Sequence, residues 1–310
     1  MIIVTKKVAA KNTSTNINEN RGLANRMWQF AYFLAFAMEH KITLINFSFA
    51  EHAEHFEGTR KNLFCSFPQI KVPFAININW LNRMFKISLW FKRISKGLRR
   101  RIPRLNSLFS FISIKDISKK ENYFNLDKKE NYELITKYKI VFIEGWKIRC
   151  NRTLIRHNHA VKKYFMPRNK NIENVENIIK PIKKKHDILI GLHIRRGDYK
   201  EYAPQYYFTY EEYILFIQKI IKYFKDENNI AFIICSDEKI DRELFEQYPC
   251  YYSTGHYIED MYILSKCNYI FGVSSTFSIW ASFFGEVPLY LIDNKDLNIK
   301  KEGFKIYQSL

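Results

Sequence analysis

Four residues suited to binding an anion or moving a proton follow one short apolar run in the second half of the chain. His193, Arg195, Arg196 and Asp198 come soon after the run Ile188–Ile190. This pattern is typical of a buried parallel strand that ends at a polar site, and open α/β sheets bind ligands at such strand ends. Each guanidinium presents a fixed fork of donors matched to phosphate or carboxylate oxygens, so the pair indicates an anion site. The alternative is an Arg–Asp ion pair that only orders a turn.

The elements that position these residues form a regular alternation. Strands are expected over 188–194, 230–235, 250–253, 269–273 and 288–292, and helices over 211–224, 239–247, 258–265 and 278–284. Alternating strands and helices predict a doubly wound parallel sheet. Polar residues follow two more of these strands, Ser236 and Asp237 after one and Ser274 to Thr276 after another. We therefore expect a nucleotide site at one edge of one sheet.

Each further candidate has a functional and a structural interpretation. Asp237, beside Ser236, is suited to binding ribose hydroxyls, or it caps the following helix. Ser275 and Thr276 precede a helix and are suited to holding a phosphate, or they act only as its cap. Asp260, at the start of a helix, either recognises a base or stabilises the helix dipole. Their convergence favours the nucleotide site over separate capping roles.

The first half begins with a predicted strand over 2–4 and a polar loop. A helix is expected to start after Gly22, and its apolar positions have helical spacing from Met27 onward. The loop from Gly22 through Asn25 to Arg26 either aims N–H groups at an anion or is an ordinary βα turn. Strands are expected over 42–47 and 139–146. His52 and His55 have a metal-site spacing, but they lack a nearby third ligand and are expected on a solvated helix face.

Composition indicates a globular intracellular protein. The chain has 310 residues, of which 47% are hydrophobic, so it can bury a large core. Its five cysteines are scattered without any CxxC spacing, which argues against a disulfide framework or a structural zinc site and predicts a reducing cytoplasm. The N-terminal apolar stretch is too short for a signal peptide, and no run reaches the roughly 18 residues of a membrane span.

Positive charge is concentrated in one segment. The formal net charge is +19, and residues 58–115 contain 13 Lys and Arg and no acidic residue. Within residues 80–104, aromatic and aliphatic residues recur at helical spacing among the cations. This is the pattern of a helix that lies on an anionic membrane. A core helix with a solvated basic face and a nucleic-acid patch are the two alternatives, and no nucleic-acid fold signature supports the latter.

Two domains follow from these patterns. The first is expected over 1–166, with a basic insertion around 58–115, and the second over 188–310. The Lys- and Asn-rich residues 167–187, which include Pro181, have the weakest apolar periodicity and are expected to form a linker.

Three blocks together carry a family resemblance. Residues 193–199 (HIRRGDY) resemble the HxRRxDY motif of the α-1,2-fucosyltransferases, glycosyltransferase family 11. Residues 22–31 resemble the family's N-terminal GLGNQxFQYA block, and residues 260–267 with 274–280 together resemble its third block, DxxLMSxC followed by NSTFSWW. The resemblance spans residues 22–280, although residues 58–185 contribute almost nothing to it. It implies a GT-B fold, in which two Rossmann-like domains face each other across a cleft and the C-terminal one binds GDP-β-L-fucose.

The resemblance also implies roles for individual residues. Arg195, with Arg196, would neutralise the donor diphosphate, and His193 would contact the nucleotide. Asp260 would read the guanine edge, and Ser275 and Thr276 would bind phosphate. Gly22, Asn25 and Arg26 belong to the N-terminal block, whose Asn25 and Arg26 would close on the sugar phosphate. Neither a cofactor nor a metal is expected, because arginines stabilise the leaving GDP and no DxD pair is present.

The expected reaction is an inverting transfer of L-fucose to a sugar hydroxyl, in α-1,2 linkage, on a surface polysaccharide or lipid-linked glycan. Asp198, Glu201 and His157 are candidates for the base that accepts the acceptor's proton, and Asp198 is alternatively an anchor for the arginines. The sequence departs from the family at Ala24, Arg26 and Ile279, which puts the acceptor and linkage in question. The rivals are a transferase that uses another GDP-sugar and a non-enzymatic basic module that binds membrane or nucleic acid.

Overall fold

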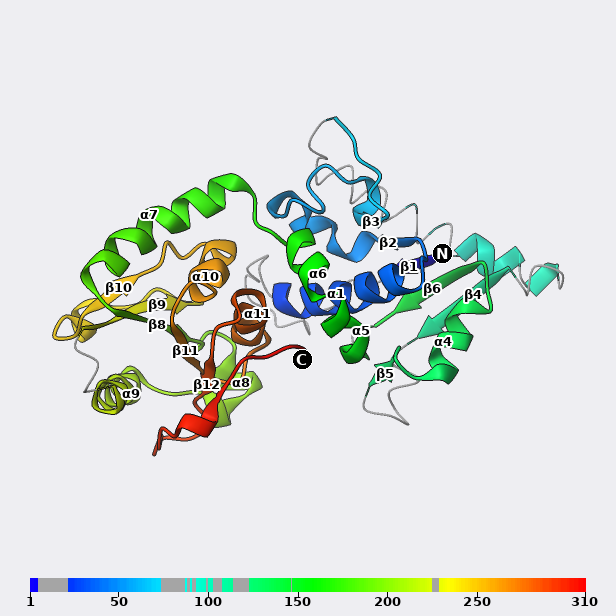
Figure 1. Ribbon diagram of the computed structural model, residues 1–310. Coiled ribbons are helices and arrows are strands. Elements are labelled where there is room, and N and C mark those ends of the chain that lie inside the picture. Colours follow the sequence, from blue (N-terminus) through cyan, green and yellow to red (C-terminus); the bar gives the residue numbers. More distant parts are fainter. Residues whose placement is uncertain are drawn as a thin grey trace. The chain divides into compact units, whose positions relative to one another are not determined.

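The chain folds into two compact units. The structure, a computed structural model, describes residues 1–4, 22–73, 87, 90, 93–98, 100–102, 108–113, 123–145, 147–224 and 229–310. Unit 1 comprises Met1–Met166 with Ser309–Leu310, and unit 2 comprises Pro167–Gln308 (Figure 1). The first boundary coincides with the one expected from the sequence.

Unit 1 is built on a five-stranded sheet with the order β3-β2-β1-β6-β4. Its strands are β1 (Ile2–Val4), β2 (Leu44–Asn46), β3 (Ser66–Phe67), β4 (Phe109–Ser113) and β6 (Ile140–Glu144), and only β3 runs antiparallel to its neighbour. β5 (Phe124–Asn125) and β7 (Ile148–Arg149) form a separate parallel pair. The helices are α1 (Leu23–Glu39), α4 (Lys129–Thr136), α5 (Asn151–Arg156) and α6 (Asn158–Tyr164), with 3-10 segments η1 (Phe47–His55) and η2 (Leu63–Cys65).

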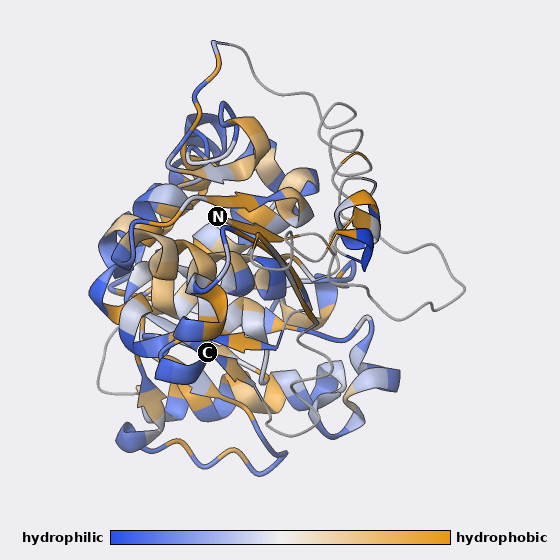
Figure 2. Cartoon of the chain, turned by 90° about the vertical axis from the view of Figure 1, so that its right-hand side faces the viewer, coloured by the Kyte–Doolittle hydropathy of each residue, from blue (hydrophilic) through white to orange (hydrophobic). Residues whose placement is uncertain are grey.

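α1 is the central helix of unit 1. Its residues from Met27 to Ala37 are all buried, as expected of a helix that is apolar on every side. Phe30 makes edge-on ring contacts with Phe49, Tyr164 and Phe165, with centroids 5.2 to 5.5 Å apart. In Figure 2 the strands beside the N-terminus are coloured as hydrophobic, in agreement with the burial of β1. This packing fixes the position of α1, whose first turn was expected to be either an anion-binding loop or an ordinary βα turn.

The two histidines with metal-site spacing are not on a solvated face, and that expectation was wrong. His52 and His55 lie in η1 with 1% and 8% of their surface exposed. The tighter 3-10 turn replaces the expected α-helix and directs both rings inward. Within the described residues, no group of three or more His, Cys, Asp or Glu is placed to hold a metal ion.

Unit 2 contains a six-stranded sheet with the order β10-β9-β8-β11-β12-β13. Its strands are β8 (Ile188–Ile194), β9 (Ile230–Ser236), β10 (Cys250–Tyr252), β11 (Tyr269–Gly272), β12 (Leu289–Leu291) and β13 (Phe304–Lys305). All pair in parallel except β13, which runs antiparallel to β12. The helices are α7 (Asn169–Lys185), α8 (Tyr199–Tyr202), α9 (Tyr210–Tyr223), α10 (Tyr257–Leu264) and α11 (Thr276–Gly285), with 3-10 segments η4 (Pro204–Tyr206), η5 (Glu243–Phe245) and η6 (Lys301–Gly303).

β8 is the core strand of this sheet, and all seven of its residues are buried. It lies between β9 and β11. The strands β9 and β10 are added on one side of β8, and the later strands β11 to β13 on the other. Gly191 allows α10 to pack closely, because a Cβ there would lie 2.6 Å from the Cδ2 atom of Leu264. α9 begins with a complete capping box formed by Thr209 and Glu212. The predicted doubly wound sheet is therefore present, with β13 as an antiparallel addition.

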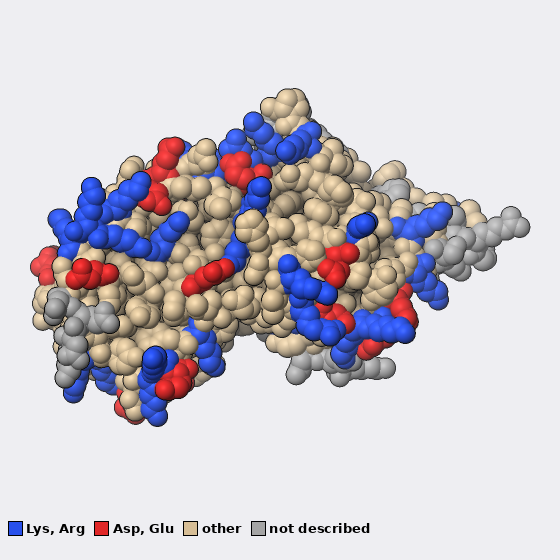
Figure 3. Space-filling view, viewed as in Figure 1, with Lys and Arg blue, Asp and Glu red and all other residues tan. Residues whose placement is uncertain are grey.

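Two elements of unit 2 differ from expectation. Residues 167–187 do not form a linker, because α7 spans Asn169–Lys185 and packs on α10. Val175, Ile179 and Ile182 form the buried apolar side of this helix. The other sides carry exposed lysines, which make the segment polar in overall composition (Figure 3). The helix expected over 239–247 is reduced to the single turn η5.

The basic stretch 80–104 falls partly outside the described residues. Four of its described apolar side chains, Ile87, Trp90, Leu98 and Ile102, are 50%, 62%, 40% and 44% exposed. The described cations Arg93, Lys96, Arg100 and Arg101 are exposed too. Across the part of the chain that the structure describes, no helix combines the length and apolarity needed to cross a bilayer.

Candidate active site

The carboxyl ends of three neighbouring strands bring the candidate residues of unit 2 together. β8 pairs with β9 up to Ile194 beside Ser236, and with β11 up to His193 beside Gly272. The segments that follow these strands therefore leave the sheet at the same edge. Strand order reverses between β8 and β11, which is the position where open α/β sheets bind ligands. The sequence-predicted convergence of these segments is observed.

Arg195 lies at the centre of this edge and has two acidic neighbours. Its Nη2 donates to both carboxylate oxygens of Asp198, at 3.1 and 3.2 Å, and its Nε lies 3.7 Å from Oδ2 of Asp237. The guanidinium lies over the ring of Tyr199, 5.3 Å from the centroid. The side chain is 21% exposed, so a ligand can reach it. Arg195 thus forms the ion pair with Asp198 that the sequence suggested. It also has a second acidic neighbour, Asp237, which the sequence did not indicate.

Arg196 is held in a different environment. Its Nε lies 3.1 Å from Oε1 of Glu238, and its Nη2 donates to the hydroxyl of Tyr207 at 2.8 Å. Its guanidinium lies 3.9 Å from the ring centroid of Tyr210 and 5.1 Å from that of Tyr207. Tyr210 in turn donates to Oε1 of Glu238. Sequence reasoning missed these three partners, although Tyr207 and Tyr210 follow the arginines within one short connection.

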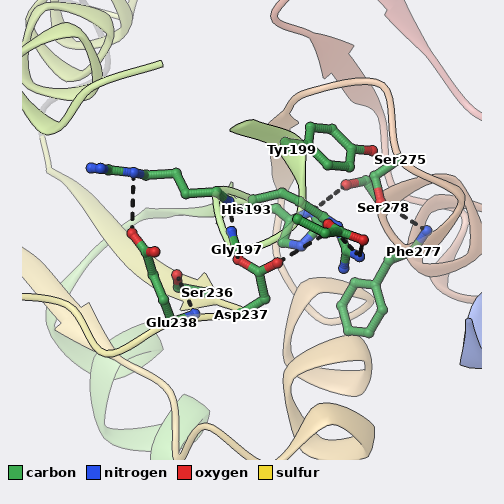
Figure 4. Close-up of polar contacts among 12 residues, drawn as sticks. His193, Gly197, Tyr199, Ser236, Asp237, Glu238, Ser275, Phe277 and Ser278 are labelled. Carbon is green, nitrogen blue, oxygen red and sulfur yellow. Dashed lines mark hydrogen bonds and ion pairs between the residues drawn. The ribbon is translucent and has the colours of Figure 1, made fainter. Parts of the chain in front are cut away.

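The turn after β8 is fastened to the end of β9 through Asp237. Oδ1 of Asp237 accepts hydrogen bonds from the backbone N–H groups of Arg196 at 3.0 Å and Gly197 at 3.2 Å (Figure 4). The neighbouring Ser236 accepts from the N–H of Glu238 through its Oγ at 3.2 Å. Ser236 thus orders its own turn, while Asp237 links two strands.

His193 is a buried neutral base inside the sheet. Its Nδ1 lies 2.6 Å from Oγ of Ser278, and its ring stacks on Phe277 at 5.0 Å (Figure 4). Burial and, to a lesser extent, the positive charge of Arg195 lower the pKa of His193 to about 3. The ring is therefore uncharged at neutral pH, and it connects the end of β8 to α11.

The N-terminus of α11 supplies oriented N–H groups at the same edge. Ser275 caps the helix by accepting from the N–H of Phe277 at 3.3 Å, so the predicted capping role is real. Thr276 is the first helical residue and is half-buried. The positive end of the helix dipole thus accompanies Arg195 at the strand ends.

Asp260 lies in the first turn of α10 and is 4% exposed. Burial raises the pKa of Asp260 to about 7, although a hydrogen bond with Ser253 opposes this shift. Among the described residues no partner donates a hydrogen bond to its Oδ1 atom. A buried carboxylate oxygen without a donor is suited to a ligand that brings its own N–H group.

The remaining candidates belong to unit 1. Gly22 has a φ of 85° and precedes α1, and Asn25 is half-buried in the first turn. Arg26 is buried and donates from Nη1 to Oε2 of Glu51 at 2.6 Å, close to His52. The anion-binding interpretation of this turn must therefore include Glu51, which the sequence did not indicate.

The three candidate bases have different surroundings. Asp198 is engaged by Arg195, as described above. Glu201 lies in α8 and is exposed. His157 of unit 1 lies with Nε2 2.6 Å from Oε2 of Glu39, and this hydrogen bond holds the pKa of Glu39 below its usual value. Each of the three remains a candidate on geometry alone.

The chemistry of the unit 2 edge is that of an anion site. Arg195 and the α11 N-terminus provide positive potential, and carboxylates balance Arg195 in the free protein. A diphosphate that arrives here would meet a guanidinium already held in one orientation.

The chain is similar to known glycosyltransferases. A family model described as Glycosyl transferase family 11 matches residues 93–302. No curated protein matches the sequence. A mutant of Arabidopsis thaliana FUT1 in complex with GDP is 12% identical with a TM-score of 0.55, covering 98% of this chain and 73% of that one.

Fucosyltransferase NodZ from Bradyrhizobium is also similar. It is 15% identical with a TM-score of 0.54, covering 94% of this chain and 98% of that one. NodZ α-1,6-fucosyltransferase soaked with GDP-fucose gives a TM-score of 0.51 at 15% identity, covering 94% of both chains. At these identities the likeness concerns the fold, and it confirms the predicted GT-B class.

Proposed function

Because the chain belongs to glycosyl transferase family 11, we propose that it transfers L-fucose from GDP-β-L-fucose to a hydroxyl group of a glycan. The observation that carries this proposal is the placement of Arg195 at the switch point of unit 2, on the sheet edge from which the segment leading to α11 also leaves. Structural neighbours crystallised with GDP or GDP-fucose support the choice of donor. The three sequence blocks that resemble the family support it independently.

Arg195 would act on the leaving group. Breaking the bond between fucose and the β-phosphate places negative charge on GDP, so a fixed guanidinium stabilises the transition state more than the ground state. Arg195 does here what a divalent cation does in other transferases. We therefore expect neither a cofactor nor a metal to be required, and transfer should continue in the presence of EDTA. Loss of activity in EDTA that Mg²⁺ restores would contradict this expectation.

The other candidate residues would contact different parts of the donor nucleotide. Ser275 and Thr276 would bind phosphate at the α11 N-terminus, and Asp260 would accept N–H groups of guanine. His193 would contact the nucleotide as a neutral ring. For Gly22, Asn25 and Arg26 of unit 1, a role in binding the sugar phosphate rests on the family resemblance, and Arg26 would have to exchange Glu51 for the ligand.

The reaction would invert the configuration at the sugar carbon. Attack by the acceptor hydroxyl opposite the departing GDP needs a base, for which Asp198, Glu201 and His157 are candidates. We propose an α-1,2 linkage to a galactoside-like acceptor on a surface polysaccharide or lipid-linked glycan, as in lipopolysaccharide or capsule. The family resemblance supports this linkage, while the α-1,6 activity printed for NodZ is the competing possibility.

Calorimetry with GDP tests the core of the proposal. The folded protein should bind GDP, and Arg195→Ala should weaken binding about tenfold or more, because a charge-assisted contact is lost. Lys219→Ala, on the exposed side of α9, is a matched control that removes one cation elsewhere. A folded protein that does not bind GDP, or an Arg195→Ala variant with wild-type affinity, would refute the proposal.

A transferase that uses another GDP-sugar is the rival within the same fold. Incubating the enzyme with different GDP-sugars and a panel of glycans, and measuring released GDP, separates the two. Fucose-dependent release that requires an acceptor supports the fucosyltransferase. Faster release from another GDP-sugar would favour the rival.

We further propose that residues 80–104 bind the anionic inner face of the plasma membrane, where lipid-linked glycans are assembled. Ile87, Trp90, Leu98 and Ile102 fall near one helical face by their spacing, and all are exposed. The 13 cations of residues 58–115 would attract anionic lipid, each contributing about 1 kcal/mol near the surface. The protein would then act on the cytoplasmic side, without nucleic acid as a partner.

Co-sedimentation with phosphatidylserine vesicles tests the membrane contact. Replacing Arg99, Arg100 and Arg101 by Gln should weaken binding roughly 100-fold, from about 3 kcal/mol of lost attraction. The control replaces Lys183, Lys184 and Lys185, three exposed cations at the end of α7. Equal losses for both triple variants would show that only total charge matters. Tight DNA binding through 58–115, together with an absence of GDP release, would instead favour the basic binding module.

A further inference from the structure

The two residues that follow β9 are acidic, and they lie opposite the two arginines that follow β8. Asp237 faces the turn and the Nε atom of Arg195, whereas Glu238 faces Arg196 (Figure 4). Each of the two neighbouring arginines is therefore next to its own acid. We propose that Asp237 is a positioning residue that sets Arg195 for the donor diphosphate and does not itself bind the ribose. This inference rests on the proposed function, because it assumes that a GDP-sugar binds at this edge.

One carboxylate oxygen of Asp237, Oδ1, is occupied by hydrogen bonds within the protein. Its Oδ1 accepts from two successive backbone N–H groups, of Arg196 and Gly197, at 3.0 and 3.2 Å. Successive N–H groups of this kind form a concave anion site, and here the anion is the protein's own carboxylate. Its Oδ2 lies 3.7 Å from Nε of Arg195. These two N–H groups are therefore not available to a phosphate, which leaves Arg195 and the N-terminus of α11 as groups that can bind it.

Gly197 permits this close approach. A Cβ at residue 197 would lie 3.0 Å from Oδ2 of Asp237 and 3.3 Å from its Cγ, tighter than ordinary contact. A side chain there would push the carboxylate away from the turn. The glycine of the arginine motif and the aspartate of the neighbouring strand thus depend on each other, which neither segment reveals alone.

The consequence for Arg195 is a guanidinium fixed on three sides. Asp237 lies at Nε, Asp198 accepts from Nη2, and the ring of Tyr199 lies beneath the plane. Among the described residues no group accepts from Nη1, so this nitrogen remains for a ligand. A long side chain fixed before binding loses less freedom on contact with the diphosphate. Asp237 therefore contributes to donor binding through Arg195.

Binding of GDP and of guanosine separates positioning from ribose contact. Guanosine keeps the base and ribose but lacks phosphate, and its affinity can be measured by ligand-observed NMR. We expect Asp237→Ala to weaken GDP binding about tenfold and to change guanosine binding less than twofold. In the Arg195→Ala background, Asp237→Ala should add less than a twofold loss, because both act through one contact. Asp237→Asn, which keeps the acceptor for the turn, should stay within threefold of wild type for GDP.

Gly197→Ala keeps the test valid where Asp237→Ala fails to fold. This variant displaces the same carboxylate without removing it. It should weaken the binding of GDP and leave the binding of guanosine unchanged. Asp241→Ala is the matched control, since this exposed acid lies four residues further along and should leave both affinities unchanged. Equal losses for GDP and guanosine in Asp237→Ala or Gly197→Ala, or multiplicative losses with Arg195→Ala, would overturn the positioning role. Wild-type protein that binds neither ligand would refute the proposed function and this inference with it.

Discussion

Replacing Glu259 should lower the stability of unit 2, because its carboxylate connects α10, the helix that carries Asp260, to α7. It is 5% exposed, and its carboxylate accepts from Asn171 at 3.1 Å, Asn174 at 2.6 Å and Thr254 at 2.7 Å. Glu259→Ala leaves the buried amide of Asn171 without its acceptor and removes two further hydrogen bonds to a charged group. A buried unsatisfied group costs about 1–3 kcal/mol, and the other donors regain water in part. We expect a loss of about 3 kcal/mol in the free energy of unfolding.

Glu259→Gln should cost less, about 1 kcal/mol, because its carbonyl oxygen still accepts from the asparagines and its amide can donate to Thr254. Burial alone would raise the pKa of Glu259, but hydrogen bonds from Asn174 and Thr254 outweigh it and hold the pKa below its usual value. The carboxylate therefore contributes stability above about pH 4.5, and this contribution is lost as pH falls through the lowered folded pKa. The Gln variant should lack that acid-dependent loss.

Urea unfolding and thermal melts measure both effects. A loss of about 3 kcal/mol corresponds to a drop of roughly 6–12 °C in Tm for a unit of this size. The control is Glu176→Ala on α7, which removes only an exposed ion pair with Lys180 at 3.7 Å and should cost less than about 0.5 kcal/mol. If Glu259→Ala is no less stable than this control, the carboxylate does not hold α7 and α10 together and the reasoning is refuted.

Three further predictions concern the same unit. Gly285→Ala should destabilise it by about 2 kcal/mol or more in urea unfolding, because the new Cβ would lie 2.0 Å from the carbonyl oxygen of Ser265; a wild-type midpoint would contradict this. GDP affinity should fall as pH drops through about 7, where Asp260 becomes protonated and its acceptor is lost, and Asp260→Asn should show a flatter profile by calorimetry. Arg196→Lys should lower Tm by several degrees, since lysine cannot reproduce the planar stack of the guanidinium on Tyr210 at 3.9 Å. Tyr210→Phe should lower Tm by less. A Tm of Arg196→Lys equal to that of the wild type would exclude a structural role for this stack.

The arginine motif illustrates what could be read from sequence. The apolar run of β8 followed by two arginines identified a strand end, and Ser236 and Ser275 identified two others, because buried parallel strands have continuous apolar runs. Their meeting at one edge followed from the alternation of strands and helices alone. Composition and apolar periodicity also predicted the boundary between the two units at Met166.

Other features depended on contacts between distant segments. α7 was taken for a linker because its exposed lysines outnumber the buried positions that pack on α10. His52 and His55 were placed on a solvated face because a 3-10 turn changes which side chains point inward. The partners of Arg26 and Arg196, Glu51 and Tyr210, lie on other elements, so no local spacing could indicate them.

The sequence by itself was sufficient to predict two α/β units and to place two arginines after one buried strand, where an anion site is expected. These properties follow from local patterns, since strand burial and the charge of arginine do not depend on the rest of the fold. Only the tertiary structure decided which groups hold each of the two arginines. Arg195 and Arg196 are chemically identical neighbours, and their surroundings differ because Asp237, Glu238 and Tyr210 approach them from other elements.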